Sequence, residues 1–338
     1  MFIKGKTVFF DKYPIIVGSA GVAGKKEGEG PLAQDFDAIF DDTSMGQESF
    51  EMAESAMLHD GIIRALSHGG VSASDVDFIM AGDLLDQCIG TSFGIRELQI
   101  PFLGLYGACS TMALSMGIAS VLVDSGALNY AVASTSSHFA SAERQFRLPL
   151  EYGGQRPPSA QRTATASGAS VISENKENTP CIEAVTFGKI MDLGIKDANN
   201  MGAAMAPAAA STIGDFLNDT RTSPTDYDLI LTGDLGKVGA ELLIDLLKKD
   251  YGYDISSVHG DCGLMIYDIE AQDVHAGGSG CGCSGSVVNS YIMRQLKEKT
   301  LKRVLFVGTG ALLSPTSTMQ GESIPSIAHG VLLTSGDE

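Results

Sequence analysis

The segment that decides the fold is Gly107-Ala108-Cys109-Ser110-Thr111 (GACST). The residues before it, 100–106 (IPFLGLY), are apolar and partly aromatic, which predicts a buried strand. The residues after it, 111–125 (TMALSMGIASVLVDS), are apolar almost all round, as in a helix buried within a large core. Cys109 is therefore expected at a strand-to-helix turn, where free N–H groups and the helix dipole favour an anion, a thiolate or a ligand carboxylate. The alternative is a packed free cysteine that only fills the core.

The composition is that of a globular protein with a strongly acidic charge balance. A chain of 338 residues, 44% of them hydrophobic, has room for two domains or for two halves that share one core. The net charge of −18 argues against nucleic acid as a partner and against direct adhesion to an anionic lipid surface. No run approaches the ~20 apolar residues of a membrane span, and residues 1–14 (MFIKGKTVFFDKYP) do not resemble a secretory signal. We therefore expect a soluble protein of the cytoplasmic type.

The cysteines indicate a reducing compartment. The six of them, Cys88, Cys109, Cys181, Cys262, Cys281 and Cys283, form no paired framework. The C-x-C pair at 281–283 has no second pair nearby, so no zinc site is expected. The glycine run at 277–280 lacks the G-K-[ST] ending of a phosphate-binding loop.

An internal duplication organises the chain. Residues 75–84 (DVDFIMAGDL) return as 226–235 (DYDLILTGDL), with six of ten positions identical at an offset of 151. A second correspondence, at an offset of 174, aligns the tripeptide at 108–110 with that at 282–284, each opening a helix. The remaining expected elements are a helix at 46–67 and strands at 15–21, 76–81, 129–135 (matching 303–309) and 166–173. The sequence thus predicts an α/β protein made of two duplicated halves, 1–173 and 174–338, whose sheets are covered by helices and bury a shared helical layer.

These residues also resemble a known family. A duplicated α/β half with a cysteine at the first elbow is similar to the thiolase and β-ketoacyl synthase superfamily, and 274–281 (VHAGGSGC) is similar to the glycine-rich histidine motif of thiolases. The closer resemblance is to the stage V sporulation protein AD family, a non-catalytic branch of that superfamily. It is carried by 26–33 (KEGEGPLA), 107–111 (GACST), 135–147 (TSSHFASAERQFR) and 275–284 (HAGGSGCGCS). The resemblance implies a thiolase-like, layered αβαβα fold.

The resemblance also implies a function in sporulation. The family takes part in moving dipicolinic acid, with calcium, into the developing spore. It acts with small membrane proteins of the same operon at the inner spore (forespore) membrane. The resemblance therefore implies a peripheral protein, attached through these partners and homodimeric like the superfamily. No cofactor is expected. Calcium is expected to arrive with the ligand or not at all, because no EF-hand-like spacing occurs and Asp234, Asp261 and Asp273 would coordinate it only if the fold gathered them.

The catalytic parts of the superfamily are incomplete in this sequence. A condensing or thiolytic enzyme needs a thiolate, a base to activate it and donors for the thioester oxyanion. Cys109 and His275 match the nucleophile and the base. The second catalytic cysteine of thiolases falls on Phe306, and the strand where synthases carry a histidine or asparagine ends in Asp234, which would repel an enolate. The sequence therefore predicts a thiolase-like scaffold that has lost condensing activity.

A ligand site is expected over the Cys109 elbow. Dipicolinate is a flat, rigid dianion that suits helix N-terminal amides, hydroxyls and guanidinium groups. The insertion after the 129–135 strand supplies Arg144, Arg147, Arg156 and Arg162, and the first two share a face if that segment is helical. The predicted ligand-binding residues are Cys109, Ser110, Thr111, His138, Arg144, Arg147, Gln161 and His275.

Other interpretations stay open at this point. Each arginine could form a surface ion pair with a neighbour such as Glu143 or Glu151, and His138 could be a structural group. A rival function is a thioester-dependent acyltransferase or condensing enzyme that uses Cys109 as its nucleophile. Another is a purely structural subunit of a membrane complex, which needs no pocket.

Overall fold

The computed structural model describes residues 1–146, 155–174 and 180–336. The first half contains β1 (Phe2–Lys4), β2 (Thr7–Phe9), β3 (Ile15–Gly24), β4 (Ala38–Phe40), α1 (Phe50–Gly69), β5 (Phe78–Gly82), α2 (Ile89–Ile95), β6 (Phe102–Gly104), α3 (Thr111–Asp124), β7 (Tyr130–Ser137), α4 (Phe139–Phe146), β8 (Arg162–Thr163) and β9 (Ala166–Ser173). The second contains β10 (Cys181–Phe187), α5 (Met201–Thr220), β11 (Leu229–Thr232), α6 (Gly236–Asp250), β12 (His259–Asp261), α7 (Cys262–Met265), β13 (Gly278–Ser279), α8 (Cys281–Val287), α9 (Met293–Lys297), β14 (Arg303–Ala311), α10 (Pro315–Met319) and β15 (Ser326–Thr334).

The strand order confirms the duplication. The main sheet runs β12-β11-β14-β15-β10-β3-β9-β7-β5-β6, so each half contributes five strands in the same relative order. In each half the repeated strand, β5 or β11, pairs in parallel with β7 or β14, which in turn pairs antiparallel with β9 or β15. Within the described chain β3 and β10 meet at a single residue pair, Ile15 and Cys181. The N-terminal hairpin of β1 and β2 joins the strands of the second half, because β2 pairs with β10.

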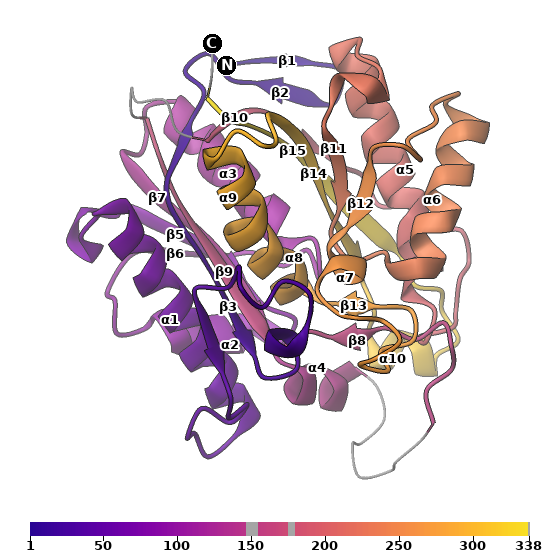
Figure 1. Cartoon of the computed structure of the whole chain (residues 1–338), viewed down its shortest axis with the longest axis horizontal. Helices are drawn as coiled ribbons and strands as arrows, with labels where there is room; N and C mark the ends of the chain where they lie inside the picture. Colours follow the sequence, from indigo (N-terminus) through magenta and orange to yellow (C-terminus); the bar gives the residue numbers. More distant parts are fainter. Residues whose placement is uncertain (147–154, 175–179, 337–338) are drawn as a thin grey trace.

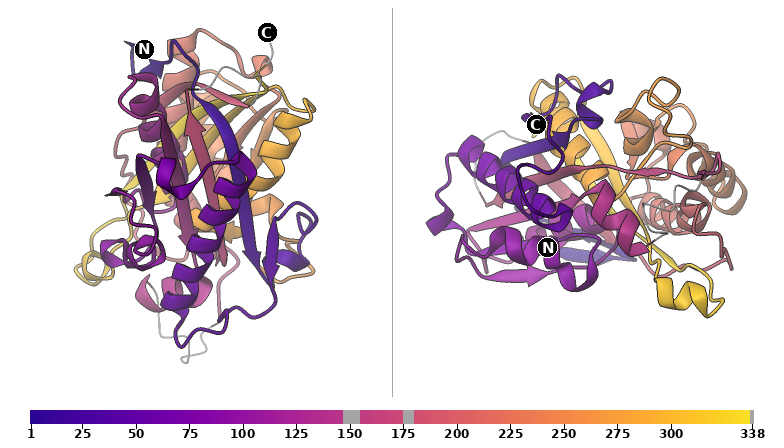
Figure 2. Two further views of the ribbon diagram at one scale, coloured as in Figure 1. Left: turned by 90° about the vertical axis from the view of Figure 1, so that its left-hand side faces the viewer. Right: turned by 90° about the horizontal axis from the view of Figure 1, so that it is seen from below.

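The strands of each half form one layer of the fold, and helices form the other three layers. In the first half α1 lies on β3, β9 and β7, and in the second half α5 lies on β14 and β15 with α6 against it. α3 lies between the strands of the first half and those of the second half and packs on both. α8 packs on β7 and β9 of the first half (Figure 1). This is the αβαβα arrangement that the family resemblance implies, and Figure 2 gives two further views of it.

The helix ends follow from local chemistry. α1 begins after Ser49, whose hydroxyl accepts from the Met52 N–H, and ends at Gly70 in the left-handed conformation (φ 61°). The predicted 46–67 helix is therefore displaced toward the C-terminus. α3 is buried on almost every side, as its composition predicted.

Two predicted elements differ in extent. The 100–106 strand is only β6, because it lies at the end of the sheet and its Leu103 is exposed. α8 begins at Cys281, so Cys283 lies inside the helix and does not open it. In the part of the chain that the structure describes, none of the helices combines the length and apolar character needed to cross a membrane.

Candidate functional site

The Cys109 turn uses its own polar groups to hold itself together. Ala108 adopts a left-handed conformation (φ 48°), which turns the chain from β6 into α3. Ser110 Oγ donates to the Gly107 carbonyl and Thr111 Oγ1 to the Ala108 carbonyl, each at 2.6 Å. The backbone N–H groups of Ser110 and Thr111 donate to the same two carbonyls, and both residues are fully buried. The hydroxyl and backbone N–H groups of Ser110 and Thr111, which we expected to bind a ligand, therefore form hydrogen bonds within the turn itself.

Strand β14 of the second half passes directly against this turn. A Cβ added at Gly310 would lie 2.3 Å from the Gly107 carbonyl oxygen, and one at Gly308 would lie 2.8 Å from Ala113 Cβ. Glycine at both positions therefore permits the approach of the two halves. Phe306 is wholly buried in the central core and does not line the cavity beside Cys109. The glycines further along the strand, and not Phe306, therefore meet the elbow.

Asp234 lies directly after β11 and faces the Cys109 thiol. Its Oδ1 accepts from Thr309 Oγ1 at 2.7 Å, and its Oδ2 accepts from the Gly280 N–H at 2.8 Å and from Ser279 Oγ at 3.1 Å. The Cys109 thiol lies near this carboxyl group, and the two groups shift each other's pKa. These donors hold the fully buried carboxylate in one position.

The electrostatics of this pair keep the thiol protonated. Burial raises the pKa of Cys109 well above the ordinary value for cysteine, and the charge of Asp234 raises it further. Burial raises the pKa of Asp234 to about 6, although hydrogen bonds from Thr309 and Gly280 oppose the shift. At neutral pH the pair is therefore a thiol beside a carboxylate. The thiolate that thioester chemistry needs is therefore disfavoured at neutral pH in this arrangement.

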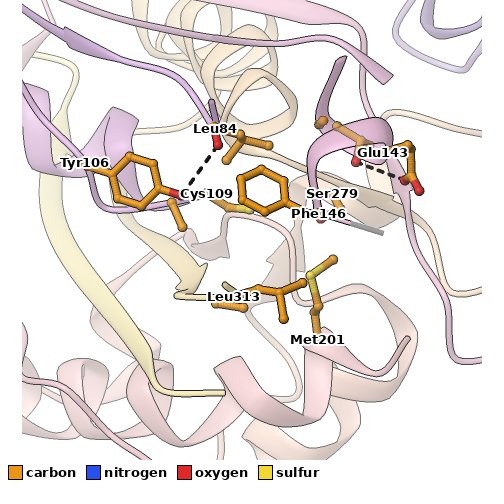
Figure 3. A pocket seen from close by; sticks show the side chains of 12 residues that line it. Leu84, Tyr106, Cys109, Glu143, Phe146, Met201, Ser279 and Leu313 are labelled. Atoms are coloured by element: carbon orange, nitrogen blue, oxygen red, sulfur yellow. Dashed lines mark hydrogen bonds between the residues drawn. The ribbon is translucent and has the colours of Figure 1, made fainter. Parts of the chain in front are cut away.

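A small cavity lies against the thiol (Figure 3). Its volume is about 40 Å³, enough for roughly three waters at ~10–15 Å³ each. It is lined by Leu84, Tyr106, Ala108, Cys109, Ala142, Glu143, Phe146, Thr163, Met201, Ser279, Ala311 and Leu313. Most of this wall is apolar, and both halves of the chain contribute to it.

A buried carboxylate, Glu143, is the charged group of the cavity wall, and Arg156 pairs with it from outside that wall. Arg156 Nη2 lies 2.8 Å from Oε1 of the buried Glu143, and Arg156 Nη1 donates to the Gln161 carbonyl at 2.9 Å. The guanidinium groups of Arg156 and Arg162 lie 5.1 and 3.9 Å from the centre of the Phe139 ring. The ion-pair interpretation of Arg156 is therefore correct, but its acidic partner belongs to the cavity wall.

Of the other predicted ligand residues that the structure describes, none lines this cavity. His138 Nε2 donates to the Thr43 carbonyl at 2.8 Å, and its ring stacks on a phenylalanine of α1. Arg144 pairs with Glu51 on the outer side of α4. Gln161 Nε2 donates to the Asp234 and Gly278 carbonyls, both at 2.7 Å. His275 lies half-buried in the loop before β13 with φ 55°, and Arg147 lies outside the described residues.

A second buried thiol, Cys281, lies close to the first, although the repeat counterpart of Cys109 is Cys283. Cys281, at the start of α8, belongs to the same small apolar cluster as Cys109 and donates to the Ser136 carbonyl at 2.9 Å. Burial raises the pKa of Cys281 well above its ordinary value, and the charges of Glu54, of Asp83 (the repeat counterpart of Asp234) and of Asp234 itself raise it further. Burial, and then the charge of Asp83, raises the pKa of Glu54 to about 8. Each half thus places a cysteine near an aspartate of the other half.

Much of the cavity wall is not apparent from the sequence. Glu143 reads there only as a surface partner for an arginine, and Phe146, Met201 and Leu313 give no signal because apolar residues near turns are common. Ser279, and not His275, is the residue through which the glycine-rich motif reaches the cavity. Among the described residues, no cluster of three or more histidine, cysteine, aspartate or glutamate side chains could hold a metal ion. All six cysteines are free, as predicted.

Comparison with known proteins decides the family. The family model for stage V sporulation protein AD (SpoVAD) matches residues 4–334. Stage V sporulation protein AD of Bacillus subtilis (strain 168) is 50% identical over 333 residues, which cover 98% of each chain. The chain belongs to the SpoVAD family.

The structural neighbours of this SpoVAD-family chain are condensing enzymes. Xanthomonas campestris OleA bound to cerulenin has a TM-score of 0.60 at 12% identity, over 99% of this chain and 100% of that one. The 3-oxoacyl-[acyl-carrier-protein] synthase III from Aquifex aeolicus VF5 has a TM-score of 0.55 at 11% identity, over 95% and 99%. At this identity the likeness establishes a shared thiolase-like fold and carries no activity with it.

Proposed function

We propose that this SpoVAD-family protein is a non-catalytic carrier that binds dipicolinate, alone or with calcium, during its uptake into the developing spore. The observation that carries the proposal is the Cys109–Asp234 pair. Both side chains are buried, and the pKa of the thiol is held far above neutrality. A scaffold that keeps the superfamily's nucleophile protonated is better suited to binding than to acyl transfer.

The surroundings of Cys109 argue against the acyltransferase alternative. Neither His275 nor His138 lines the cavity, so no described histidine is placed to take the proton of Cys109. Asp234 is a poor substitute, because its pKa of about 6 lies far below that of the thiol. A negative charge at this position also disfavours the enolate of a condensing reaction.

The ligand is proposed to enter at the arginine side of the cavity. A pyridine ring with two carboxylates exceeds a volume of about 40 Å³, so binding requires the side chains of Phe146, Met201 and Leu313 to move outward. Arg156 and Arg162 would meet the carboxylates, while Phe146 and Tyr106 offer faces for the ring. Calcium would offset the repulsion between the dianion and the buried acids.

Attachment to the membrane and dimerisation are further parts of the proposal. The net charge of −18 favours attachment through membrane proteins over direct contact with anionic lipid. In the described chain β6 pairs only with β5, which leaves its other edge open. Phe93, Leu103 and Tyr106 are exposed beside this edge. A second copy could pair with β6 in the antiparallel sense, which a two-fold axis permits.

Isothermal titration of dipicolinate into the purified protein, with and without calcium, tests the binding function. We expect one saturable site that survives in Cys109→Ala, because the thiol is part of the wall and not a nucleophile. Arg156→Gln should weaken binding about tenfold, since it removes a guanidinium group that would meet a ligand carboxylate in a charge-assisted hydrogen bond.

Two results would contradict this proposal. An equal loss in Arg144→Gln, whose side chain faces away from the cavity, would move the ligand to the outer side of α4. No binding under any condition, together with acylation of Cys109 by an acyl-CoA in intact-mass measurements, would favour the enzyme.

A further inference from the structure

Asp234 is a buried carboxylate directly behind the wall of the Cys109 cavity. Ser279 lines the cavity, and its Oγ donates to Asp234 Oδ2 at 3.1 Å. Cys109, which also lines the cavity, lies near the same carboxyl group. The other hydrogen bonds to the carboxylate come from Thr309 Oγ1 at 2.7 Å and from the Gly280 N–H at 2.8 Å. Within the described chain, every group that donates a hydrogen bond to this carboxylate is thus neutral.

The other carboxylate of the cavity has a cationic partner. Glu143 lines the cavity, and its Oε1 lies 2.8 Å from Arg156 Nη2. The charges of these two side chains largely cancel each other. Asp234 forms no ion pair with a lysine, arginine or histidine of the described chain, so its negative charge stays uncancelled behind Cys109 and Ser279.

An anion that enters the cavity changes the electrostatic surroundings of Asp234. The carboxyl groups of dipicolinate have ordinary pKa values of about 4, so the ligand is a dianion at neutral pH. Like charges repel each other strongly in a buried site, where water and salt screen them little. A dianion placed beside Cys109 and Ser279 therefore favours the protonated form of the carboxyl group behind them.

The pKa of Asp234 lies close to the value that such a response requires. Burial raises this pKa to about 6 in the free protein, so the group is mostly ionised at neutral pH. Charges within a few ångströms shift the pKa of a carboxyl group by about 1–3 units. A ligand carboxylate beside Ser279 would therefore raise the pKa of Asp234 to neutral pH or above.

The titratable groups nearest to Asp234 are four thiols and one carboxyl group. Burial holds the pKa values of the thiols well above the ordinary value, so all four are neutral with or without ligand: Cys109, Cys262, Cys281 and Cys283. The carboxyl group is Asp261, whose pKa burial also raises. Asp261 accepts hydrogen bonds from a threonine hydroxyl and from backbone N–H groups, and it does not line the cavity.

Other charged groups surround the site at the neighbouring elements. On α6 and in the loop before β13, Lys237 is exposed and His275 is half-buried. In the first half, Glu54 has a pKa of about 8 and already holds its proton at neutral pH. Burial also raises the pKa of Asp83, which precedes Leu84 of the cavity wall. Asp234 combines a position directly behind the wall with a carboxylate that is ionised before the ligand arrives.

We propose that the Cys109 cavity binds its anionic ligand together with one proton, which Asp234 takes from the solvent. One dianion and one proton enter the site and nothing leaves, so the complex gains one negative charge instead of two. The proton fits on Oδ1, because the Thr309 hydroxyl can accept as well as donate, whereas the Gly280 N–H on Oδ2 can only donate. The inference rests on the proposed dipicolinate site and adds a proton to what that site binds.

Isothermal titration of dipicolinate at about pH 7, in metal-free Hepes and in metal-free Tris, measures the number of protons taken up. The two buffers release different heats when they give up a proton, so uptake appears as a difference between the observed binding enthalpies. We expect wild-type protein to take up between about half a proton and one proton per ligand. Its affinity should fall by up to about tenfold for each pH unit above neutrality.

Asp234→Asn, made in the Cys109→Ala background, identifies the group that accepts the proton. Asparagine keeps an oxygen acceptor for Gly280 and Ser279 and can turn its amide toward the Thr309 hydroxyl. Removing the thiol keeps its own titration out of the measurement. We expect this variant to bind without proton uptake and with an affinity that does not change with pH. The matched control, Asp261→Asn in the same background, should still take up the proton.

The possible failures are distinguishable. Saturable binding to wild-type protein without proton uptake would overturn this inference and leave the proposed binding function intact. Proton uptake that persists in Asp234→Asn would assign the proton to another group, such as Asp83, and would overturn the inference as well. No binding of dipicolinate at any pH would overturn the proposed function and this inference together.

Discussion

Replacing Asp234 by asparagine is expected to lower the pKa of the Cys109 thiol and to make it reactive at moderately alkaline pH. The substitution keeps the size of the side chain and removes the charge that faces the thiol. Burial, the larger cause of the raised pKa, is unchanged, because Cys109 is only 5% exposed. The experiment therefore isolates the contribution of the carboxylate.

The size of the effect follows from the geometry. A unit charge within about 4 Å contributes up to about 4 kcal/mol at an effective dielectric constant of about 20. This corresponds to about 3 pKa units. The hydrogen bonds that Asp234 receives from Thr309, Ser279 and Gly280 spread its charge, so we expect a fall of roughly 1–3 units.

The assay is alkylation of Cys109 by iodoacetamide between mildly acidic and alkaline pH, followed by peptide mass spectrometry. The matched control is Asp261→Asn, which also removes a buried carboxylate, but one bonded to Thr232 and to backbone N–H groups of Leu235 and Gly236. We expect the rate profile to move to lower pH in Asp234→Asn and to stay in place in the control. An unchanged pH–rate profile in Asp234→Asn would show that the carboxylate does not raise the pKa of the Cys109 thiol.

Three further predictions concern stability, measured by urea unfolding. Glu54 has a pKa of about 8 in the folded protein against an ordinary value near 4.5, so between these pH values the folded state keeps a proton that the unfolded state releases. The free energy of unfolding should therefore fall as pH rises from about 4.5 to 8. Glu54→Gln should flatten this slope, and an unchanged slope would contradict the pKa shift. Gly310→Ala should cost about 2 kcal/mol or more through its clash with the elbow, while Gly330→Ala, with its nearest atom at 3.6 Å, should cost less than about 1 kcal/mol; equal effects would count against the close approach. Tyr267→Phe removes the hydroxyl that donates to the buried Glu27 and should cost about 1–3 kcal/mol, and a neutral result would show that another donor replaces it.

The architecture could be predicted from the sequence because the internal repeat is visible in it. The repeat of 75–84 at 226–235 gave β5 and β11 equivalent places, and the strand order confirmed this. The ends of elements were less predictable. β6 is short because it lies at the end of the sheet, a position that its apolar composition does not reveal.

The site was predictable in position and not in detail. The strand-to-helix turn located Cys109 correctly, since it depends on local patterning. Ser110 and Thr111 form hydrogen bonds within their own turn because Ala108 adopts the left-handed conformation. This conformation is not expected for an alanine, so the sequence does not predict it. The pairing of Arg156 with Glu143 joins α4 to the segment before β8, so it exists only in the folded chain.

The placement of Cys109 opposite Asp234 has a consequence for measuring the motions of this protein. The thiol belongs to the first half and the carboxylate to the second, and the two sheets meet edge to edge at one residue pair in the described chain. Separation of the halves would remove both the burial and the charge that silence the thiol. Where labelling proceeds only through such separation, and is therefore the same in Asp234→Asn, the ratio of the labelling rate in the native protein to that in a free cysteine peptide gives the equilibrium constant for opening. Cys109 is in this sense a native probe, already in place, of how often the two halves of the molecule part.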